Sequence, residues 1–381
     1  MFARKSLIAV AVLAALSGTA FADNSAVNTS QNGDRNALNV DQAFAAGSKI
    51  DINQNGTRND SVVKQVGASN TAAVTQVSGT PLPKDVDQVA KLTQGGTQNN
   101  ANIRQEGTTG TKVTATINQA VNGGHGNDAG VTQVAGSGNA QARVDQAGDN
   151  HKAYISQNKT IAGVATVEQK GDSNYAAINQ TDSYMGESVK VTQGGFSNKG
   201  YITQYDTDFK NASVNQSGNN NVGVVEQYNA NFGGATITQT GTLGDARAYQ
   251  RSGNNMNANI TQAGTGNHAT ADQAGHNHNA TVKQDGADNG LVAVSQRGLN
   301  ETALVTQSWG SDNSAYVNQS GAYNEETLLQ TGFNNTATIS QSGIAASGTA
   351  NTVNLTQSGN FQTATISQSG GANNSAVVTQ R

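Results

Sequence analysis

The chain of 381 residues contains no cysteine, only two prolines, and few aromatic or charged residues. Aromatic residues make up 5%, charged residues 13% and hydrophobic residues 35%, whereas ordinary globular domains are about 45–50% apolar and about 25% charged. The sequence therefore lacks the material for the two or three bulky cores that its length would otherwise imply. Without cysteine, stability must come from backbone pairing and packing rather than from disulfides.

The composition does not indicate an ordinary disordered chain either. Disordered chains combine low hydrophobicity with high net charge and many prolines, but here the formal net charge is only −4 at pH 7. No basic patch of the kind that binds nucleic acid is present, so we expect no nucleic-acid partner. Asparagine, glutamine, serine, threonine, glycine and alanine predominate, which is compatible with an aggregation-prone low-complexity tract or with a repeat protein that has a thin core.

The first 22 residues have the features of a secretory signal peptide. Arg4 and Lys5 form a basic start, residues 7–16 are an apolar run of ten, and residues 20–22 have the small-residue pattern of a cleavage site. The apolar run is too short to span a membrane, which needs about 20 residues. We therefore predict a signal peptide at 1–22 and a single exported, soluble repeat domain at 23–381.

The most informative pattern is the regular spacing of glutamine. Of 34 glutamines, 30 form one series, in which 15 of the 29 intervals are eleven residues and eight are twelve. Val, Ile or Leu stands two residues before these glutamines in 27 of 30 cases, and Ala stands four before in 20. Gly commonly follows two residues later, which gives the unit Ala-x-Val-x-Gln-x-Gly-x-x-Asn. An apolar period of two predicts a β-strand with Ala, Val and Gln on one face.

Such a strand buries too little to be stable alone, so the units must stack on one another. Alternation between eleven and twelve residues indicates two kinds of arc and therefore two strands in each coil. The sequence predicts an all-β fold, a two-sheet β-solenoid of strand-arc-strand coils with cross-β stacking. Thirty strands give about 15 coils, or a rod about 70 Å long at about 4.8 Å per layer.

Two sets of residues are the candidate site of this fold. A buried amide costs about 1–3 kcal/mol if it is unpaired, but stacked glutamines can donate to one neighbour and accept from the other. The predicted polymer-core ladder comprises Gln65, Gln76, Gln94, Gln105, Gln169, Gln180, Gln193, Gln204, Gln216, Gln227, Gln330 and Gln341. The predicted arc residues, chosen because Gly and Asn tolerate positive φ, are Gly67, Asn70, Gly171, Asn174, Gly218, Asn221, Gly332 and Asn335.

Three irregular places interrupt the pattern. The 18 residues from Gln76 to Gln94 contain both prolines, Pro81 and Pro83, and we expect a bulging loop there because proline is not accommodated in a central strand. A second long interval of 16 residues precedes Gln357. Glu326 stands where a small, buried residue is expected, so either residues 323–329 are locally shifted or that layer is weak.

The ends of the repeat array suggest an activity. The repeats begin soon after the predicted cleavage site, and only Arg381 follows the last ladder residue, Gln380. Soluble solenoids usually end in caps that shield their edge strands. We therefore expect bare, matching edges at both ends, head-to-tail stacking of copies, and fibres.

The repeat resembles that of the curlins, the subunits of curli, a functional amyloid of bacterial biofilms. Residues 65–76 match the curlin pattern Gln-x-Gly-x-x-Asn-x-Ala-x-Val-x-Gln, and residues 94–105, 169–180 and 330–341 match it with Ile in place of Val. The resemblance covers nearly all of 23–381, although familiar curlins have fewer repeats and a longer segment before the first one. It implies export through an outer-membrane secretion channel, a nucleator subunit, extracellular homopolymer fibres, and roles in adhesion and biofilm.

Other functions find less support in the sequence. His276 and His278 form the only histidine pair, and a metal site needs three or four convergent ligands. We expect no enzyme, no cofactor and no metal, with histidine replacing asparagine in arcs. A monomeric adhesin or a surface- or ice-binding solenoid stays open as the alternative. An ice-binding array would need outward Thr-x-Thr in every layer, however, and only Thr236 and Thr238 provide it among the 30 strands.

Overall fold

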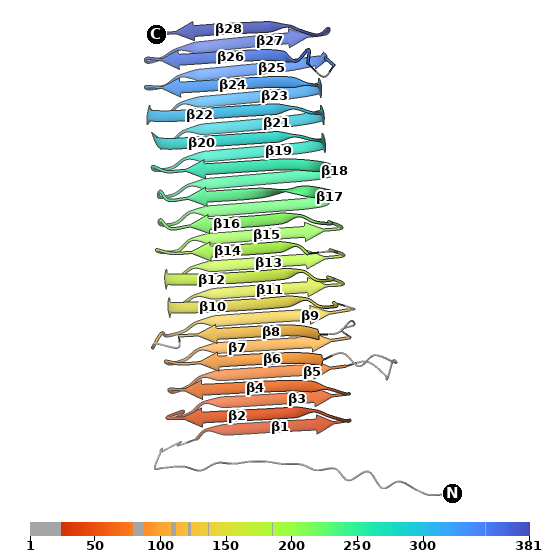
Figure 1. Ribbon diagram of the computed structural model, residues 1–381. Helices are drawn as coiled ribbons and strands as arrows, with labels where there is room; N and C mark the ends of the chain where they lie inside the picture. Colours follow the sequence, from red (N-terminus) through yellow and green to blue (C-terminus); the bar gives the residue numbers. More distant parts are fainter. Residues whose placement is uncertain are drawn as a thin grey trace, which may run out of the picture.

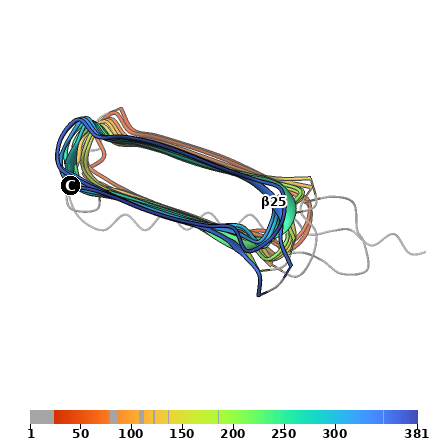
Figure 2. The same ribbon diagram turned by 90° about the horizontal axis from the view of Figure 1, so that it is seen from above.

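The computed structural model describes residues 24–78, 87–107, 112–120, 123–135, 137–184, 186–346 and 348–381. These residues form 28 β-strands and no helix, and the strands are stacked from the N-terminal to the C-terminal end in one tall column (Figure 1). Seen along the column, every coil has two long, nearly straight sides joined by narrow arcs (Figure 2). The predicted signal peptide at 1–22 lies outside the described residues and stays a prediction.

The two long sides are two parallel sheets, named here sheet A and sheet B. Sheet A contains β1 (Ala26–Asn32), β3 (Lys49–Asn55), β5 (Thr71–Val77), β7 (Asn100–Glu106), β9 (Asp128–Val134), β11 (Lys152–Asn158), β13 (Tyr175–Thr181), β15 (Lys199–Tyr205), β19 (His268–His276), β21 (Leu291–Leu299), β23 (Ser314–Ala322), β25 (Thr336–Ile344) and β27 (Thr363–Ser369). Sheet B contains β2 (Ala37–Ala43), β4 (Asn59–Val66), β6 (Asp87–Gln94), β8 (Lys112–Gln119), β10 (Gln141–Asp149), β12 (Val164–Asp172), β14 (Ser188–Gln193), β16 (Asn211–Gln216), β20 (Asn279–Asp288), β22 (Thr302–Ser311), β24 (Asn324–Thr331), β26 (Asn351–Ser358) and β28 (Ser375–Gln380).

Two long strands, β17 (Val222–Gln239) and β18 (Asp245–Gln262), pass from sheet A around an arc into sheet B. Each carries two ladder glutamines, so the 28 strands hold all 30 repeats. Pairing between neighbouring coils is parallel, with glutamine opposite glutamine, as for Gln180 and Gln204. The prediction of a two-sheet β-solenoid with about 15 coils is confirmed.

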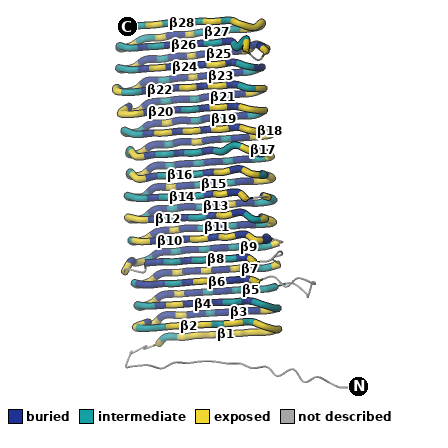
Figure 3. Tube along the Cα trace, in the orientation of Figure 1, coloured by how far each residue is buried: buried dark blue, intermediate teal, exposed yellow. Residues whose placement is uncertain are grey.

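The core consists of small apolar side chains stacked in columns between the sheets. In a typical coil, Ala176 and Ile178 of β13 are fully buried, as are Val189 and Val191 of β14. This arrangement recurs along the stack, and the buried apolar residues form one hydrophobic cluster. Burial alternates along the strands inside the stack, and exposure increases in the first and last coils (Figure 3). One Ala and one Val or Ile for each strand explain the low hydrophobic content of the chain.

Differences in repeat length are absorbed in the arcs, not in the strands. The twelve-residue interval from Gln250 to Gln262 stacks on the eleven-residue interval from Gln273 to Gln284. The extra residue is accommodated by a register shift between β18 and β19, which lies between Arg251 and Asn254. The long interval before Gln357 contains a tight turn in which Thr349 N donates to Ala346 O at 3.0 Å. The predicted loop around Pro81 and Pro83 lies outside the described residues.

The strand that carries Glu326 is not shifted. Glu326 stands opposite Ala303 of β22 and Val353 of β26, and Gln330 on the same strand stays in register with Gln307. Of the two alternatives for residues 323–329, a local shift is therefore wrong, because the neighbouring strands hold β24 in register on both sides. A weak layer stays a prediction. The carboxylic side chain instead enters the core, where it is only 2% exposed.

In the part of the chain that the structure describes, no helix has the length and apolar character needed to cross a membrane.

Candidate functional site

The ladder glutamines form two continuous hydrogen-bonded columns, one for each sheet. In the sheet A column, every side-chain Nε2 donates to Oε1 of the glutamine in the following coil, from Gln31 to Gln368, at 2.6–3.1 Å. The sheet B column does the same from Gln42 to Gln380, at 2.7–2.9 Å. All these bonds point the same way, so each column has a donor end and an acceptor end.

The twelve ladder residues singled out from the sequence divide equally between the columns. Gln76, Gln105, Gln180, Gln204, Gln227 and Gln341 lie in the sheet A column, and Gln65, Gln94, Gln169, Gln193, Gln216 and Gln330 lie in the sheet B column. All twelve are buried. Their role in polymerisation stays a prediction.

The second amide proton of most ladder glutamines ties the two sheets together. Gln193 Nε2 of sheet B donates to the Tyr175 carbonyl of sheet A at 2.9 Å, and Gln216 Nε2 donates to the Lys199 carbonyl at 3.0 Å. A primary amide has two donors and an acceptor with two lone pairs. The ladder therefore satisfies both donors of a side chain that would otherwise be costly to bury.

The arc asparagines form a third stack, but not in the way expected from the sequence. Asn174 illustrates it: Oδ1 accepts from Asn198 N at 2.9 Å, while Nδ2 donates to the carbonyls of Lys170 at 2.9 Å and Gly195 at 3.1 Å. The side chain thus caps its own arc and the arc of the following coil. Asn70, Asn221 and Asn335 make equivalent bonds to the arc of the following coil.

The expectation that these asparagines adopt positive φ is wrong. Positive φ falls on the preceding residue, namely Ser69, Ser173, Asn220 and Asn334, with φ of 53–57°. The reason is that the asparagine side chain must turn into the coil to reach the backbone of the next arc. The residue before it then makes the left-handed turn.

The arc glycines are required mainly by close backbone stacking. Gly67, Gly171 and Gly332 have φ of 93–100°, as expected, but Gly218 does not lie in the positive-φ region. At all four positions a Cβ would lie 1.7–2.2 Å from the carbonyl oxygen of the glycine in the next coil. Any side chain would therefore separate neighbouring coils, whatever its backbone preference.

The described arcs that lead from sheet A to sheet B contain four buried ionisable groups, of which the sequence pattern singled out only His278. Glu187, Lys210, His278 and Glu301 all occupy the position six residues before a sheet B ladder glutamine, where asparagine is common elsewhere. A charged residue at that fixed offset is the signal that could have revealed them. Burial raises the pKa of Glu187 to about 7, although Oε1 accepts a 2.7 Å hydrogen bond from Thr207.

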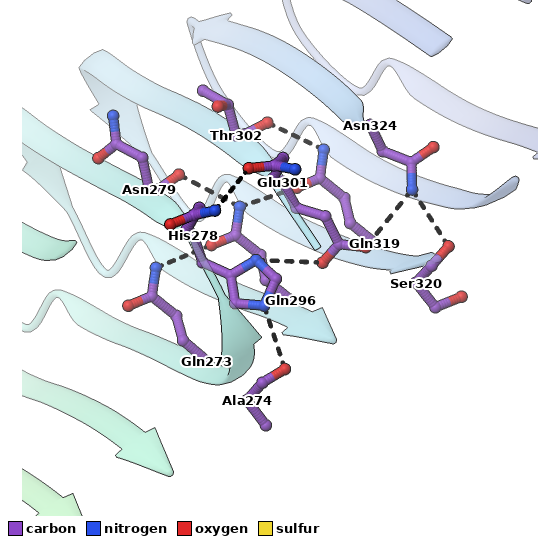
Figure 4. A network of polar contacts seen from close by, with 12 residues as sticks. Gln273, Ala274, His278, Asn279, Gln296, Glu301, Thr302, Gln319, Ser320 and Asn324 are labelled. Carbon is purple, nitrogen blue, oxygen red and sulfur yellow. Dashed lines mark hydrogen bonds and ion pairs between the residues drawn. The ribbon is translucent and has the colours of Figure 1, made fainter. Parts of the chain in front are cut away.

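His278 and Glu301 face each other in adjacent coils (Figure 4). Nδ1 of His278 lies 3.7 Å from Oε2 of Glu301, too far for a hydrogen bond. Burial raises the pKa of Glu301 to about 8 and lowers the pKa of His278, so both groups are neutral near pH 7 and do not form an ion pair. The ring is held by a 3.1 Å contact of Nε2 with the Ala274 carbonyl, and Asn324 Nδ2 donates to Glu301 at 3.4 Å.

Glu326 is the least compensated group of the described residues. Neither carboxyl oxygen has a hydrogen-bond partner. Burial raises the pKa of this carboxyl well above its usual value, so Glu326 is buried as the neutral acid.

The other histidines do not converge on a metal site. His151 takes an asparagine position, where Nδ1 accepts from Asn174 N at 3.2 Å and Nε2 contacts the Ala147 carbonyl at 3.1 Å. His125, His268 and His276 are exposed. No group of three or more His, Asp and Glu residues within the described ranges is arranged to hold a metal ion.

The first and last coils expose the two ends of each column (Figure 3). Gln31 and Gln42 accept no bond from another ladder glutamine in the described residues, while Gln368 and Gln380 donate none to another. Each of the latter has one proton engaged, with the carbonyls of Thr352 at 3.1 Å and Thr363 at 3.0 Å. The N-terminal end of the stack therefore presents amide acceptors, and the C-terminal end presents amide donors.

A parallel two-sheet solenoid with glutamine and asparagine columns defines the class of β-solenoid repeat proteins, which stack similar strand-arc-strand coils. The family model described as "Curlin associated repeat" matches residues 45–77, 253–286 and 348–381, at the beginning, middle and end of the stack. These three matches show that the chain carries curlin repeats. The family of that repeat is structural and is associated with extracellular curli fibres. No curated protein matches the sequence.

Proposed function

We propose that this protein is a secreted structural subunit, not an enzyme, that assembles head-to-tail into extracellular curli-type amyloid fibres, which support adhesion and a biofilm matrix. The presence of curlin repeats supports the structural role. The observation that carries the assembly step is the single direction of both glutamine columns, from Gln31 and Gln42 to Gln368 and Gln380.

The two ends of the stack fit each other chemically. A second copy placed on the last coil would set the acceptors of its Gln31 and Gln42 over the free donors of Gln368 and Gln380. The apolar columns would continue in the same way, with Ile366 and Val378 covered by the first coil of the next copy. Such a contact joins different surfaces of identical chains, so it does not close and yields a filament.

The direct test is fibre formation by the purified chain after removal of denaturant. We expect thioflavin-positive fibres with a meridional reflection at about 4.7–4.8 Å. A chain that persists as a folded monomer at high concentration would overturn assembly and would favour the monomeric adhesin.

A pair of variants tests whether the end coil is the contact surface. Val378 and Val377 are adjacent in β28, but Val378 points into the column and Val377 is 72% exposed on the outer face. Val378→Lys places a charge where the next copy must stack, so we expect elongation to slow at least tenfold, whereas Val377→Lys should have little effect. Equal rates for the two variants would show that assembly uses another surface.

Export by an outer-membrane secretion channel and nucleation by a second subunit are part of the proposal and rest on the family. Deleting residues 1–22 should retain the chain in the cell, and coexpression with a curli secretion channel should release it. Release without that channel would contradict this route but not the assembly mechanism.

A further inference from the structure

Five tyrosines on the outer face of sheet A lie beside one another across neighbouring coils. The ring centroids of Tyr154 and Tyr175 are 6.0 Å apart, those of Tyr175 and Tyr201 5.4 Å, and those of Tyr205 and Tyr228 6.4 Å. Interplanar angles of 38–52° make all three pairs tilted contacts. These distances are within the range of direct aromatic contact, about 4.5–7 Å.

The register of the coils creates these pairs. Tyr205 of β15 stands directly opposite Tyr228 of β17. Tyr175 of β13 is diagonal to Tyr154 and Tyr201, which both pair with Ala177. Because Ala177 is small, all three rings can gather around it, and diagonal neighbours on a sheet are within reach of aromatic side chains.

The rings are accessible, and one of them has a proton acceptor. Tyr205 is 44% exposed, and the other four are half-buried. The Tyr154 hydroxyl donates a hydrogen bond to the Asp128 carboxylate. Gly130 leaves room for this ring, since a Cβ there would lie only 3.0 Å from Tyr154 Cδ1. Burial and then Asp128 raise the pKa of Tyr154, so the phenol is protonated at neutral pH and must lose its proton on oxidation.

We propose that these three pairs are sites of oxidative dityrosine cross-linking between coils, driven by a haem peroxidase and hydrogen peroxide. The peroxidase removes one electron and the hydroxyl proton from each of two phenols. The resulting phenoxyl radicals form a carbon–carbon bond between their ortho carbons. The two ortho hydrogens move to the phenol oxygens, and hydrogen peroxide, having taken up two electrons and two protons, leaves as two waters.

The surroundings make the pairs unequal in their chemistry. At Tyr154 the Asp128 carboxylate accepts the hydroxyl proton as the electron leaves, because the two groups already share a hydrogen bond. Tyr175 has two ring neighbours and two ortho positions, so it can join both Tyr154 and Tyr201. In a chain without cysteine, such bonds would covalently join strands that are distant in sequence, as disulfides do in other exported proteins.

The test treats the dilute, folded chain with limiting hydrogen peroxide and a haem peroxidase, followed by proteolysis and mass spectrometry. We expect intrachain peptides that have lost two hydrogens and join Tyr175 to Tyr154, Tyr175 to Tyr201, and Tyr205 to Tyr228. In guanidinium this selectivity should disappear. Intrachain linkage in the folded chain through Tyr316 or Tyr249, the latter covered by the Arg251 guanidinium at 4.9 Å, at equal yield would overturn the proposal.

Conservative variants separate the pairs. Tyr175→Phe should abolish both linkages to residue 175 and leave the Tyr205–Tyr228 linkage unchanged, while Tyr316→Phe should change none. Asp128→Asn should lower linkage at Tyr154 several-fold relative to Tyr205–Tyr228; equal yields would overturn the role of the carboxylate. The same pattern in the Val378→Lys variant would show that cross-linking depends on coil register and not on fibre assembly.

Discussion

Lys210 Nζ donates a 2.9 Å hydrogen bond to Oε1 of Gln250, which lies two coils further along the stack. The coil between them has Gly233 at the position equivalent to Lys210, so no side chain obstructs the path there. Gln250 Oε1 also accepts from Gln227 Nε2 at 2.8 Å, and Lys210 thus adds a second donor to the sheet A ladder. Lys210 is fully buried. Burial lowers its pKa, and the nearby Glu187 carboxyl partly opposes that shift.

Lys210 should make stability depend on pH on the alkaline side of neutrality. Burial lowers its pKa from 10.5 to about 7, so the folded chain binds fewer protons than the unfolded chain between these values. The free energy of unfolding should therefore be highest above pH 10.5, the pKa of the unfolded lysine, and should decrease as pH falls towards 7. The slope is at most about 1.4 kcal/mol per pH unit. We expect Lys210→Met to remove this slope in denaturant titrations between pH 7 and 10. The exposed Lys199→Met is the control, and an unchanged slope in Lys210→Met would contradict the burial argument.

Glu301 should act in the opposite direction. Its pKa is raised from 4.5 to about 8 by burial, so its contribution to stability is complete below the unfolded pKa and is lost as pH rises through the folded value. We expect Glu301→Gln to be less sensitive to pH than the parent chain between pH 5 and 8, as measured by urea or guanidinium midpoints. Glu226→Gln, on the outer face of β17, should follow the parent, and a parent-like profile for Glu301→Gln would count against this assignment.

Glu326 should destabilise its layer, and its removal should therefore stabilise the chain. Glu326→Ala restores the small residue found at this position in most repeats and removes two buried oxygens without partners. We expect a gain of about 1–3 kcal/mol in the free energy of unfolding at pH 7. The neighbouring Glu325→Ala, on the exposed side of the same strand, should change stability by less than about 0.5 kcal/mol. A loss of stability in Glu326→Ala would show that the carboxylic acid has a favourable role.

Glycine should be essential only where the coils touch. Gly171 has φ +93°, and a Cβ there would lie 2.2 Å from the Gly195 carbonyl oxygen, whereas a Cβ at Gly194 would meet nothing within 4 Å. We expect Gly171→Ala to cost about 1–3 kcal/mol through strain and lost stacking, and Gly194→Ala to be close to neutral. Equal denaturation midpoints for the two variants would mean that the arcs can separate at little cost.

Removing a block of the ladder should impair assembly more than changing the outer face. The ladder variant replaces Gln193, Gln204, Gln216 and Gln227 by Ala, and the control replaces outward Thr192, Thr203, Asn215 and Glu226 by Ala. The ladder variant leaves Gln180 Nε2 and Gln250 Oε1 without their column partners, among others. We expect fibre formation, followed by thioflavin fluorescence, to slow at least tenfold in the ladder variant and much less in the control. The reverse order would mean that the outer face drives assembly.

The sequence alone determined the architecture. An apolar period of two requires β-strands, and a glutamine that recurs every eleven or twelve residues requires these strands to stack as a two-sheet solenoid. Val or Ile two residues before Gln determined which face of each strand is buried. The register between stacked strands was then determined as well, since a slip of one residue would bury Thr or Lys. The twelve ladder glutamines were therefore predictable one by one. The arc asparagines were predictable in identity but not in conformation, since the left-handed turn falls on Ser173 and not on Asn174.

Only the tertiary structure decided which side chains meet between coils. Arcs differ in length, so residues in contact are separated by varying distances along the chain, as in Tyr175 with Tyr201 or Lys210 with Gln250. His278 and Glu301 both stand six residues before a sheet B ladder glutamine in consecutive coils, so the repeat itself indicates that they stack. Only the structure shows that His278 Nδ1 and Glu301 Oε2 lie 3.7 Å apart and that neither atom has a hydrogen-bond partner. The sequence pattern within one repeat specifies the coil, because the alternation of apolar and polar residues decides which face of each strand is buried. The pairing of individual groups depends on how every preceding arc positions the next strand, which is a property of the whole stack.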